Sequence, residues 1–380
     1  MIPAPAEAVK NINSAAADRS KSKDGERREG MITRESFGTD GRGNDVELFT
    51  LANTSGTQVK ISTLGATVVS FLFRDKTGTM RDVVLGYDNP ASYLENKGLY
   101  FGATVGRCAN RIANAKVTIS GTEYTLEANN GANNLHSGSN GVSHKMWETE
   151  SVDEEQNALT LKILSRDMEQ GFPGNMTIRL TFTLGEDHAL KIAYEAVSDK
   201  DTVANMTNHS YFNLAGDDAG YIGSQKLKLY AESFTPLAPV GSIPTGEIRP
   251  VEKTPMDFRE WKEIGQEIDS DYDQIVYAKG YDHNFVLDNQ GELKLMAEAL
   301  CEDTGIHLYA YTDCPGVQLY TGNFIHEHKG KNGAVYGERH GFCLESQYVP
   351  DSVNNPAFAA PFLKANEVYH SVTVYRLDLD

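Results

Sequence analysis

The sequence predicts an all-β protein with long antiparallel strands, arranged as a large sandwich or as a barrel. Three observations lead to this fold class. Apolar and polar residues alternate through several long segments, which is typical of strands with one buried face. Helical patterns are few and short. The chain also shows neither a repeat period nor a glycine-rich nucleotide-binding loop.

The strand signals begin near Val46 and continue to the C-terminus. Val117–Ser120 and Glu123–Leu126 form one expected hairpin, joined across Gly121. A longer hairpin turns at residues 185–187. Its two strands, and the strand before them, carry apolar residues at every second position: Leu159, Leu161 and Ile163, then Ile178, Leu180, Phe182 and Leu184, then Leu190, Ile192 and Tyr194. The C-terminal run Val372–Leu377 has the same β-branched and aromatic character.

Two short helices are expected between the strands. Asn89 and Pro90 have the character of an N-cap followed by proline at the first helical position. Further along, four apolar residues recur at helical spacing and would line one face of a second helix: Phe258, Trp261, Ile264 and Ile268.

Residues 1–30 are rich in Ala, Ser, Lys, Asp and Glu and contain almost no large apolar side chains. Such a segment buries too little surface to offset the entropy cost of ordering it. We therefore expect a disordered tail, with Met31 as an alternative start. Residues 31–380 are expected to form a single domain, because all-β folds with large sheets often exceed the usual domain length.

The composition excludes several classes of partner. The net charge is −18, whereas nucleic-acid binding needs a clustered basic face. No segment has the roughly 18 apolar residues of a membrane span, and none resembles a secretory signal. The cysteines show no CxxC or metal-ligand spacing, so reduced thiols are expected: Cys108, Cys301, Cys314 and Cys343. These features predict a cytoplasmic protein that binds neither nucleic acid nor membrane.

The segment Thr207–Gly216, TNHSYFNLAG, places polar residues where a strand would pack apolar ones. Alternate residues share a face of a strand, so His209, Tyr211 and Asn213 would point the same way. An imidazole, a phenol and an amide make poor core material, because buried polar groups need partners. This face would suit a wet cleft that binds a polyhydroxylated ligand. The alternative is a core histidine with a satisfied hydrogen bond.

Five further segments accompany this one: GRCANRIANAKVTISGTEYTL from Gly106, NNLHSG from Asn133, YDHNFVL from Tyr281, PGVQLYTGNF from Pro315 and GFCLESQYVPDSVNN from Gly341. In this order the six segments resemble the galactose mutarotase (aldose 1-epimerase) family, and within it the animal-type enzymes. The resemblance extends from about Phe37 to Leu377. It implies the large twisted β-sandwich called a supersandwich, with a sugar bound in an open groove on one sheet.

Interconversion of sugar anomers requires a base that takes the proton of the C1 hydroxyl and an acid that protonates the ring oxygen. The resemblance implies that Glu345 is the base. Glu345 lies among apolar residues of a strand-like segment, where burial would raise the pKa of its carboxyl and make it a better base. Taken alone, the residue fits a solvated surface glutamate equally well. Ser346 stands where the family more often has threonine, which keeps the hydroxyl.

The resemblance implies that His209 is the acid. An imidazole with its ordinary pKa near 6.5 can hold or release a proton around neutrality. Tyr211, two residues on, would line the same site, unless its ring belongs to ordinary core packing.

The same resemblance implies a sugar-binding set: Asn110, Arg111, His136, Asp282 and Gln318. Arginine offers a rigid fork of donors for hydroxyls or a ring oxygen, although a lone arginine more often forms a surface ion pair. Carboxylate and amide groups can bond adjacent sugar hydroxyls. His136 is expected on a loop at the rim, between Gly131 and Gly138. His283 would face the other side of its strand.

The cluster His326-Glu327-His328 has the residue types of a metal site, and its two histidines would share a face in a strand. No obvious third ligand accompanies them, and Lys329-Gly330-Lys331 follows directly. A solvated loop is therefore expected, with no metal.

The sequence thus predicts an isomerase, a cofactor-independent aldose 1-epimerase that acts on galactose and glucose as a monomer or a weak homodimer. Two alternatives stay open. One is a catalytically silent sugar-binding protein on the same fold. The other is a hexose-phosphate 1-epimerase, which would need extra basic residues for the phosphate. No such cluster stands near these segments.

Overall fold

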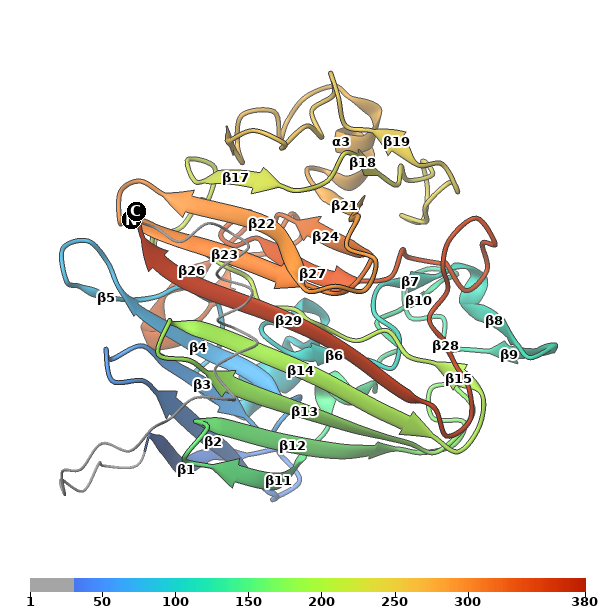
Figure 1. Ribbon diagram of the computed structural model, residues 1–380, viewed down its shortest axis with the longest axis horizontal. Helices are drawn as coiled ribbons and strands as arrows, with labels where there is room; N and C mark the ends of the chain where they lie inside the picture. Colours follow the sequence, from blue (N-terminus) through green and yellow to red (C-terminus); the bar gives the residue numbers. More distant parts are fainter. Residues whose placement is uncertain (1–30) are drawn as a thin grey trace.

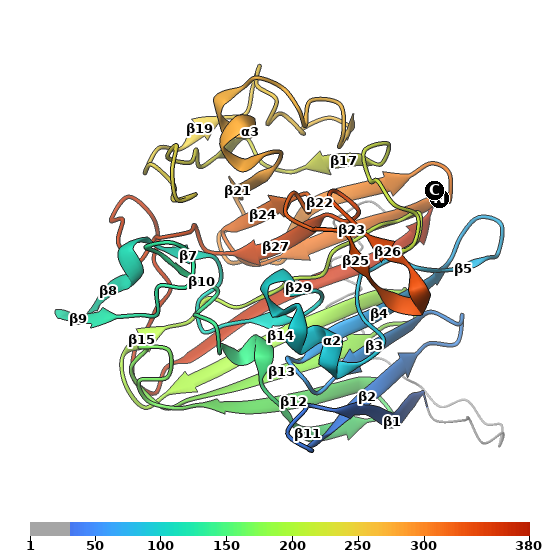
Figure 2. The ribbon, with the colours of Figure 1, turned by 180° about the vertical axis from the view of Figure 1, so that it is seen from behind.

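A computed structural model describes residues 31–380, so the predicted N-terminal tail lies outside the described residues. Strands dominate, and Figure 1 and its reverse view, Figure 2, show them stacked as layers of a twisted sandwich. The predicted all-β fold class is confirmed. The helical elements of the described residues are all short: α2 (Pro90–Glu95), α3 (Asp273–Ala278), and the 3-10 turns η1 (Lys97–Leu99), η2 (Ala113–Ala115), η3 (Val142–His144) and η4 (Lys331–Gly333).

The largest sheet has nine strands in the order β11-β12-β13-β14-β29-β23-β22-β17-β20. These strands are β11 (Glu148–Asp153), β12 (Ala158–Ser165), β13 (Met176–Leu184), β14 (Ala189–Ser198), β29 (Val368–Leu379), β23 (Ile306–Thr312), β22 (Lys294–Cys301), β17 (Lys226–Leu229) and β20 (Lys262–Glu263). β13 and β14 form the predicted hairpin, and β12 pairs antiparallel with β13. Buried and half-buried residues alternate throughout β13, because only one of its faces packs in the core.

Two five-stranded sheets complete the main architecture. One contains β1 (Ile32–Thr39), β2 (Asp45–Ala52), β3 (Gln58–Ser62), β4 (Thr67–Arg74) and β5 (Met80–Asp82) in that order. The other runs in the order β19 (Arg249–Pro250), β18 (Ser233–Phe234), β21 (Asp282–Val286), β24 (Gly316–Tyr320) and β27 (Cys343–Gln347).

Short two-stranded pairs accompany these sheets: β6 (Thr104–Val105) with β16 (Thr207–Asn208), β7 (Arg111–Ile112) with β10 (Asn134–Leu135), β8 (Lys116–Ile119) with β9 (Thr122–Thr125), β15 (Thr202–Val203) with β28 (Phe362–Leu363), and β25 (His328–Lys329) with β26 (Val335–Tyr336). The pair β8 and β9 is the predicted hairpin across Gly121.

One buried apolar cluster connects the three large sheets. It includes Phe49 of β2, Leu180 of β13 and Val317 of β24, and its members extend from Ile32 to Leu377. Burial of such side chains stabilises the fold by about 25 cal/mol for each Å² of apolar surface removed from water. The shared core supports the view that residues 31–380 form one domain, which stays a prediction.

The first predicted helix is confirmed and the second is wrong. α2 begins at Pro90, and the side chain of its N-cap Asn89 accepts a hydrogen bond from the first turn. Residues 258–268 instead form turns and the strand β20, which pairs with β17. Gly265 explains the difference. Glycine disfavours a helix, and the backbone here packs so closely on Gly223 that a Cβ would lie 3.0 Å from two of its backbone atoms.

None of the helices in residues 31–380 combines the length and apolar character that a membrane-spanning helix needs. The four cysteines form no disulfide with one another, in line with the expected reduced thiols, and all four are buried.

Candidate active site

A pocket of about 400 Å³ opens beside the five-stranded sheet that contains β21, β24 and β27. A volume of this order is typical of sites for small molecules. Seven of the eight site residues predicted from the sequence line it: Asn110, Arg111, His136, His209, Tyr211, Asp282 and Glu345. The eighth, Gln318, is not among the described residues that line the pocket. It lies behind Asp282, to which its amide donates a hydrogen bond of 2.7 Å.

One polar face of this sheet underlies the pocket. Three residues from each of three neighbouring strands share that face: Asp282, Asn284 and Val286 of β21, Gly316, Gln318 and Tyr320 of β24, and Cys343, Glu345 and Gln347 of β27. Because alternate residues point to opposite faces, Leu319 and Leu344 pack in the apolar core on the other side. His283 is fully buried on that side, next to the ring of Phe234, as predicted.

A carboxyl group and an imidazole from distant parts of the chain meet in the pocket. Nε2 of His209 lies 3.6 Å from Oε2 of Glu345, and both side chains are almost fully buried. Glu345 Oε2 has no hydrogen-bond partner among residues 31–380. An unpaired buried acceptor costs the fold free energy, and it is available to a ligand that offers a hydroxyl.

Burial moves the pKa values of these two groups in opposite directions. It raises the pKa of Glu345 well above its usual value; Asp282 raises it further and Arg111 offsets part of the shift. Burial lowers the pKa of His209 to about 4. His209 therefore does not have the pKa near 6.5 of a free imidazole, because burial penalises the charged imidazolium. When the pair holds one proton, that proton resides on Glu345.

Three side chains hold the ring of His209 in place. It stacks on Tyr211 at 5.0 Å and on Tyr100 at 5.9 Å between ring centroids. Its Nδ1 atom lies 3.5 Å from Sγ of Cys343. These contacts leave Nε2 facing Glu345. Tyr211 therefore both lines the pocket and packs against the site histidine.

The predicted polar face of His209, Tyr211 and Asn213 is only partly formed. β16 ends at Asn208, so strand alternation does not continue through the segment. Asn213 is fully buried, and its amide donates to two backbone oxygens outside the pocket. It is a structural residue, because its hydrogen bonds tie three parts of the chain together.

His136 presents a defined tautomer to the pocket. It follows β10 with a left-handed backbone (φ 51°), and its Nδ1 accepts a hydrogen bond of 3.1 Å from the backbone N–H of Asn110. Burial lowers the pKa of His136 well below its usual value, so the ring is neutral. A neutral imidazole whose Nδ1 accepts carries its proton on Nε2. His136 is therefore a hydrogen-bond donor.

The tautomer of His136 determines whether this residue can bind a metal ion. Ligand atoms of His136, His209 and Glu345 lie within 4.8 Å of one another, a spacing that suits a metal ion. However, the Nδ1 lone pair of His136 is engaged by the backbone and its Nε2 carries a proton. Neither nitrogen offers a free lone pair. The donor set therefore fits a hydrogen-bonded ligand better than a metal.

Arg111 lies in the pocket rather than in a surface ion pair. Its Nε donates to Oδ1 of Asn130 at 3.2 Å, and its Nη1 lies 3.8 Å from Oδ2 of Asp282. The side chain of Asn110 accepts a hydrogen bond of 2.9 Å from the backbone N–H of Arg111 and donates one of 3.2 Å to Gln347. Asn110 and Arg111 thus form one wall of the pocket, held by side chains from three other segments.

Sequence reasoning missed four aromatic or amide side chains that line the pocket: Tyr100, Asn130, Tyr320 and Phe324. Tyr320 follows Gln318 by two positions in β24, so strand alternation would have found it. Asn130 lies in the asparagine- and glycine-rich segment before His136. Phe324 follows a strand in a loop, where no periodic pattern identifies a pocket residue.

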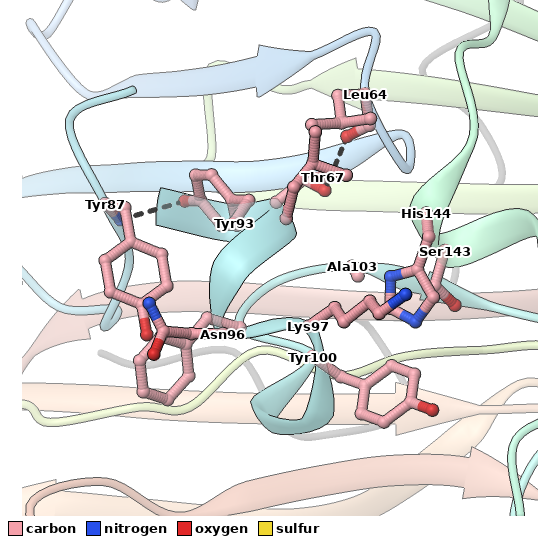
Figure 3. A pocket seen from close by; sticks show the side chains of 12 residues that line it. Leu64, Thr67, Tyr87, Tyr93, Asn96, Lys97, Tyr100, Ala103, Ser143 and His144 are labelled. Atoms are coloured by element: carbon pink, nitrogen blue, oxygen red, sulfur yellow. Dashed lines mark hydrogen bonds between the residues drawn. The ribbon is translucent and has the colours of Figure 1, made fainter. Parts of the chain in front are cut away.

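Tyr100 is placed by its backbone rather than by a pattern. It ends η1 in a left-handed conformation (φ 54°). Its ring centroid lies 4.8 Å from that of His136 and 5.1 Å from that of His144. Figure 3 shows the smaller neighbouring pocket, which Tyr100 lines together with Lys97 and His144. Tyr100 therefore forms part of the wall of both pockets.

The predicted solvated loop around His326 and His328 is correct for one residue and wrong for the other. His326 is exposed. His328 begins β25, is half-buried, bonds the hydroxyl of Tyr87 at 3.0 Å and stacks on Phe101. His328 is not solvated because its ring packs against the aromatic rings of Tyr87 and Phe101.

The fold and the pocket define a β-sandwich protein that presents a buried carboxyl group and an imidazole to a small polar ligand. A model of the family described as aldose 1-epimerase matches residues 47–376. The chain therefore belongs to the aldose 1-epimerase family, which is a family of isomerases.

Relatives and solved structures agree with this assignment. Galactose mutarotase from Sus scrofa is 39% identical over 345 residues, covering 90% of this chain and 97% of the relative. Aldose 1-epimerase from Escherichia coli K12 is 36% identical over 337 residues, covering 88% and 96%. The crystal structure of an aldose epimerase homologue from C. elegans has a TM-score of 0.80 at 29% identity, covering 87% of this chain and 98% of that one. Galactose 1-epimerase from Lactobacillus acidophilus also has a TM-score of 0.80, at 27% identity, covering 92% and 98%.

Proposed function

We propose that the protein is an aldose 1-epimerase that interconverts the α and β anomers of galactose, and also of glucose, within hexose metabolism. One observation carries the proposal. An unpartnered, buried carboxyl oxygen of Glu345 lies 3.6 Å from an imidazole nitrogen of His209 on a pocket of about 400 Å³. The names of its relatives, galactose mutarotase and aldose 1-epimerase, support the same substrate class.

In the proposed mechanism Glu345 is the base and His209 the acid. With Glu345 ionised and His209 protonated, the carboxylate takes the proton of the C1 hydroxyl while the imidazolium protonates the ring oxygen. The O1–H electron pair forms the C1=O1 double bond, and the pair of the broken C1–O5 bond stays on O5. Rotation about C1–C2 presents the other face of the aldehyde. The reverse proton transfers then close the ring to the other anomer.

The directions of the two pKa shifts favour ring opening. After that step Glu345 is protonated and His209 is neutral, which is the protonation state that burial stabilises. The same shifts disfavour the charged pair that precedes the step. Arg111, which lowers the pKa of Glu345, and the hydroxyls of the bound sugar would stabilise the ionised carboxylate.

We assign sugar binding to the side chains around the pair. His136 offers an N–H, Asp282 offers carboxylate oxygens, and Arg111 offers guanidinium donors. Asn110 and Tyr211 complete the contacting set. Gln318 would act through Asp282, because its amide bonds that carboxylate and does not line the pocket.

The charges around the pocket do not favour a sugar phosphate. Among the described residues that line it, Arg111 is the one permanently cationic side chain, and it lies beside the carboxyl groups of Asp282 and Glu345. A phosphate dianion would need further cationic donors. A free aldose, which carries no charge, fits this lining better.

Polarimetry tests the proposal directly. Freshly dissolved α-D-galactose and α-D-glucose should reach their equilibrium optical rotation faster with the protein than in buffer alone. A silent sugar-binding protein would bind galactose without changing the rate. An acceleration confined to glucose 6-phosphate would identify a hexose-phosphate epimerase instead. A rate equal to that of buffer for every sugar would contradict the proposed function.

A cytoplasmic location is part of this proposal. It is supported by four buried cysteines that form no disulfide, as is usual in a reducing compartment. A monomeric or weakly dimeric state stays a prediction.

A further inference from the structure

The amide of Gln347 joins two sides of the pocket without lining it. Gln347 is fully buried on β27, two residues beyond Glu345. Its Oε1 accepts a hydrogen bond of 3.2 Å from Asn110, and its Nε2 donates to Oε1 of Gln318 at 3.0 Å and to Oδ1 of Asn284 at 3.1 Å. Both of its N–H groups and its oxygen are therefore engaged.

The partners of Gln347 lead to side chains that line the pocket. On the sheet side, Nε2 of Gln318 donates to Oδ1 of Asp282 at 2.7 Å. On the loop side, the side-chain oxygen of Asn110 accepts from the backbone N–H of Arg111 at 2.9 Å. A series of hydrogen-bonded, buried amides thus connects the carboxylate of Asp282 on β21 with Arg111 at the start of β7.

The carboxylate of Asp282, at one end of this series of hydrogen bonds, fixes which group donates and which accepts in each of them. Oδ1 of Asp282 accepts the hydrogen bond here, so Gln318 turns its N–H group toward it. The oxygen of Gln318 then faces Gln347, which must donate. The oxygen of Gln347 is left to accept from Asn110. A side chain that cannot donate at position 347 breaks this order.

We propose that Gln347 is a positioning residue for sugar binding: its amide orients Asn110, Gln318 and, through Gln318, Asp282. This inference rests on the proposed function. Loss of the amide should weaken sugar binding more than it slows the chemical step. Glu345 and His209 are held by other contacts, namely the β27 backbone and the rings and thiol around the imidazole.

The test is Gln347→Glu, which keeps the shape, removes the amide N–H donors and adds a negative charge when the carboxyl ionises. An ionised carboxylate would accept from Asn110 but would face the oxygens of Gln318 and Asn284. A protonated one would still donate one hydrogen bond. We compare about pH 5 with a pH above the pKa of the introduced carboxyl, which burial raises. The ratio of the KM of Q347E to that of the wild type, for D-galactose, should rise about tenfold or more between these two pH values, with kcat changed much less.

Two further variants make the test specific. Q347L removes all three hydrogen bonds and should raise KM at both pH values without a pH-dependent ratio. Q225E is the matched control. Gln225 is also a buried glutamine whose two ends are engaged, by Leu214 and Asn213, but it does not line or support the pocket. Q225E should lower Tm and leave KM near the wild-type value.

The outcomes separate this inference from the proposed function. A pH-dependent rise in KM for Q347E, absent in Q225E, supports the positioning role. Wild-type KM in Q347E and Q347L, or an equal rise in Q225E, overturns it while the enzyme stays an epimerase. A wild-type protein that neither binds nor epimerises galactose would overturn the proposed function, and this inference with it.

Discussion

The Nε2 atom of His209 lies 3.6 Å from the Oε2 atom of Glu345, although one residue follows β16 and the other lies in β27. Burial stabilises the uncharged form of each group. A ligand that receives a proton from one group and gives a proton to the other can convert the charged pair to the neutral one.

We expect His209→Asn to lower kcat much more than it raises KM. Asparagine keeps a hydrogen-bond donor but cannot deliver a proton, so an interaction needed in the transition state is lost. Loss of a general acid should cost roughly 10²–10⁴-fold in rate. Steady-state kinetics with galactose measures both parameters. Normal kcat with weakened binding would show that His209 is only a ligand contact.

The plot of kcat/KM against pH should be bell-shaped. The active form of the enzyme is the one in which His209 and Glu345 together hold one proton. As the pH falls through the His209 pKa of about 4, a second proton binds and activity is lost. As the pH rises through the raised pKa of Glu345, the single proton leaves and activity falls. The acid limb therefore belongs to His209. An acid limb that persists unchanged in His209→Asn would contradict this assignment.

Glu345→Gln should stabilise the fold at neutral and alkaline pH. The folded-state pKa of Glu345 is raised, so the ionised carboxylate destabilises the fold progressively as the pH rises above the unfolded value of about 4.3. The Tm difference between E345Q and the wild type should therefore grow from about pH 5 to about pH 8. The control is Glu95→Gln, at an exposed position of α2. An equal Tm difference at both pH values would show that Glu345 is not destabilised by burial.

Activity should survive exhaustive chelation and need no added nucleotide. Ring opening of a hemiacetal moves two protons and breaks one C–O bond, which a positioned acid and base can catalyse. The bonded Nδ1 of His136 also leaves that residue without a free lone pair for a metal. Polarimetry after EDTA treatment provides the check. Loss of activity that zinc or magnesium restores would contradict this mechanism.

The sequence predicts the long strands well and the pocket only through family resemblance. β12 to β14 are recognised by alternation, because each has one buried face. The helix expected at residues 258–268 fails, because pairing of β20 and the close approach at Gly265 override the apolar spacing. Local patterns cannot predict the contact between His209 and Glu345, since it depends on how distant segments meet.

The residues that support the pocket could not be predicted from local sequence patterns either. The role of Gln347 depends on strand register, which places Gln318 opposite Glu345 and Asn284 opposite Gln318. Its contact with Asn110 depends on a loop that returns to the sheet edge. The shifted pKa of His209 also arises from burial that no local pattern reveals. Sequence identified residue types suited to the chemistry, and the fold determines their surroundings.

The most direct test of the account is the anomeric exchange of equilibrated galactose, measured by proton exchange spectroscopy with the wild type and with Glu345→Gln. The substitution keeps the shape of the side chain and removes only the proton acceptor. The wild type should give exchange between the two anomeric protons. E345Q should bind galactose with similar affinity and exchange roughly 10²–10⁴-fold more slowly. Exchange at the wild-type rate in E345Q would contradict the assignment of Glu345 as the base.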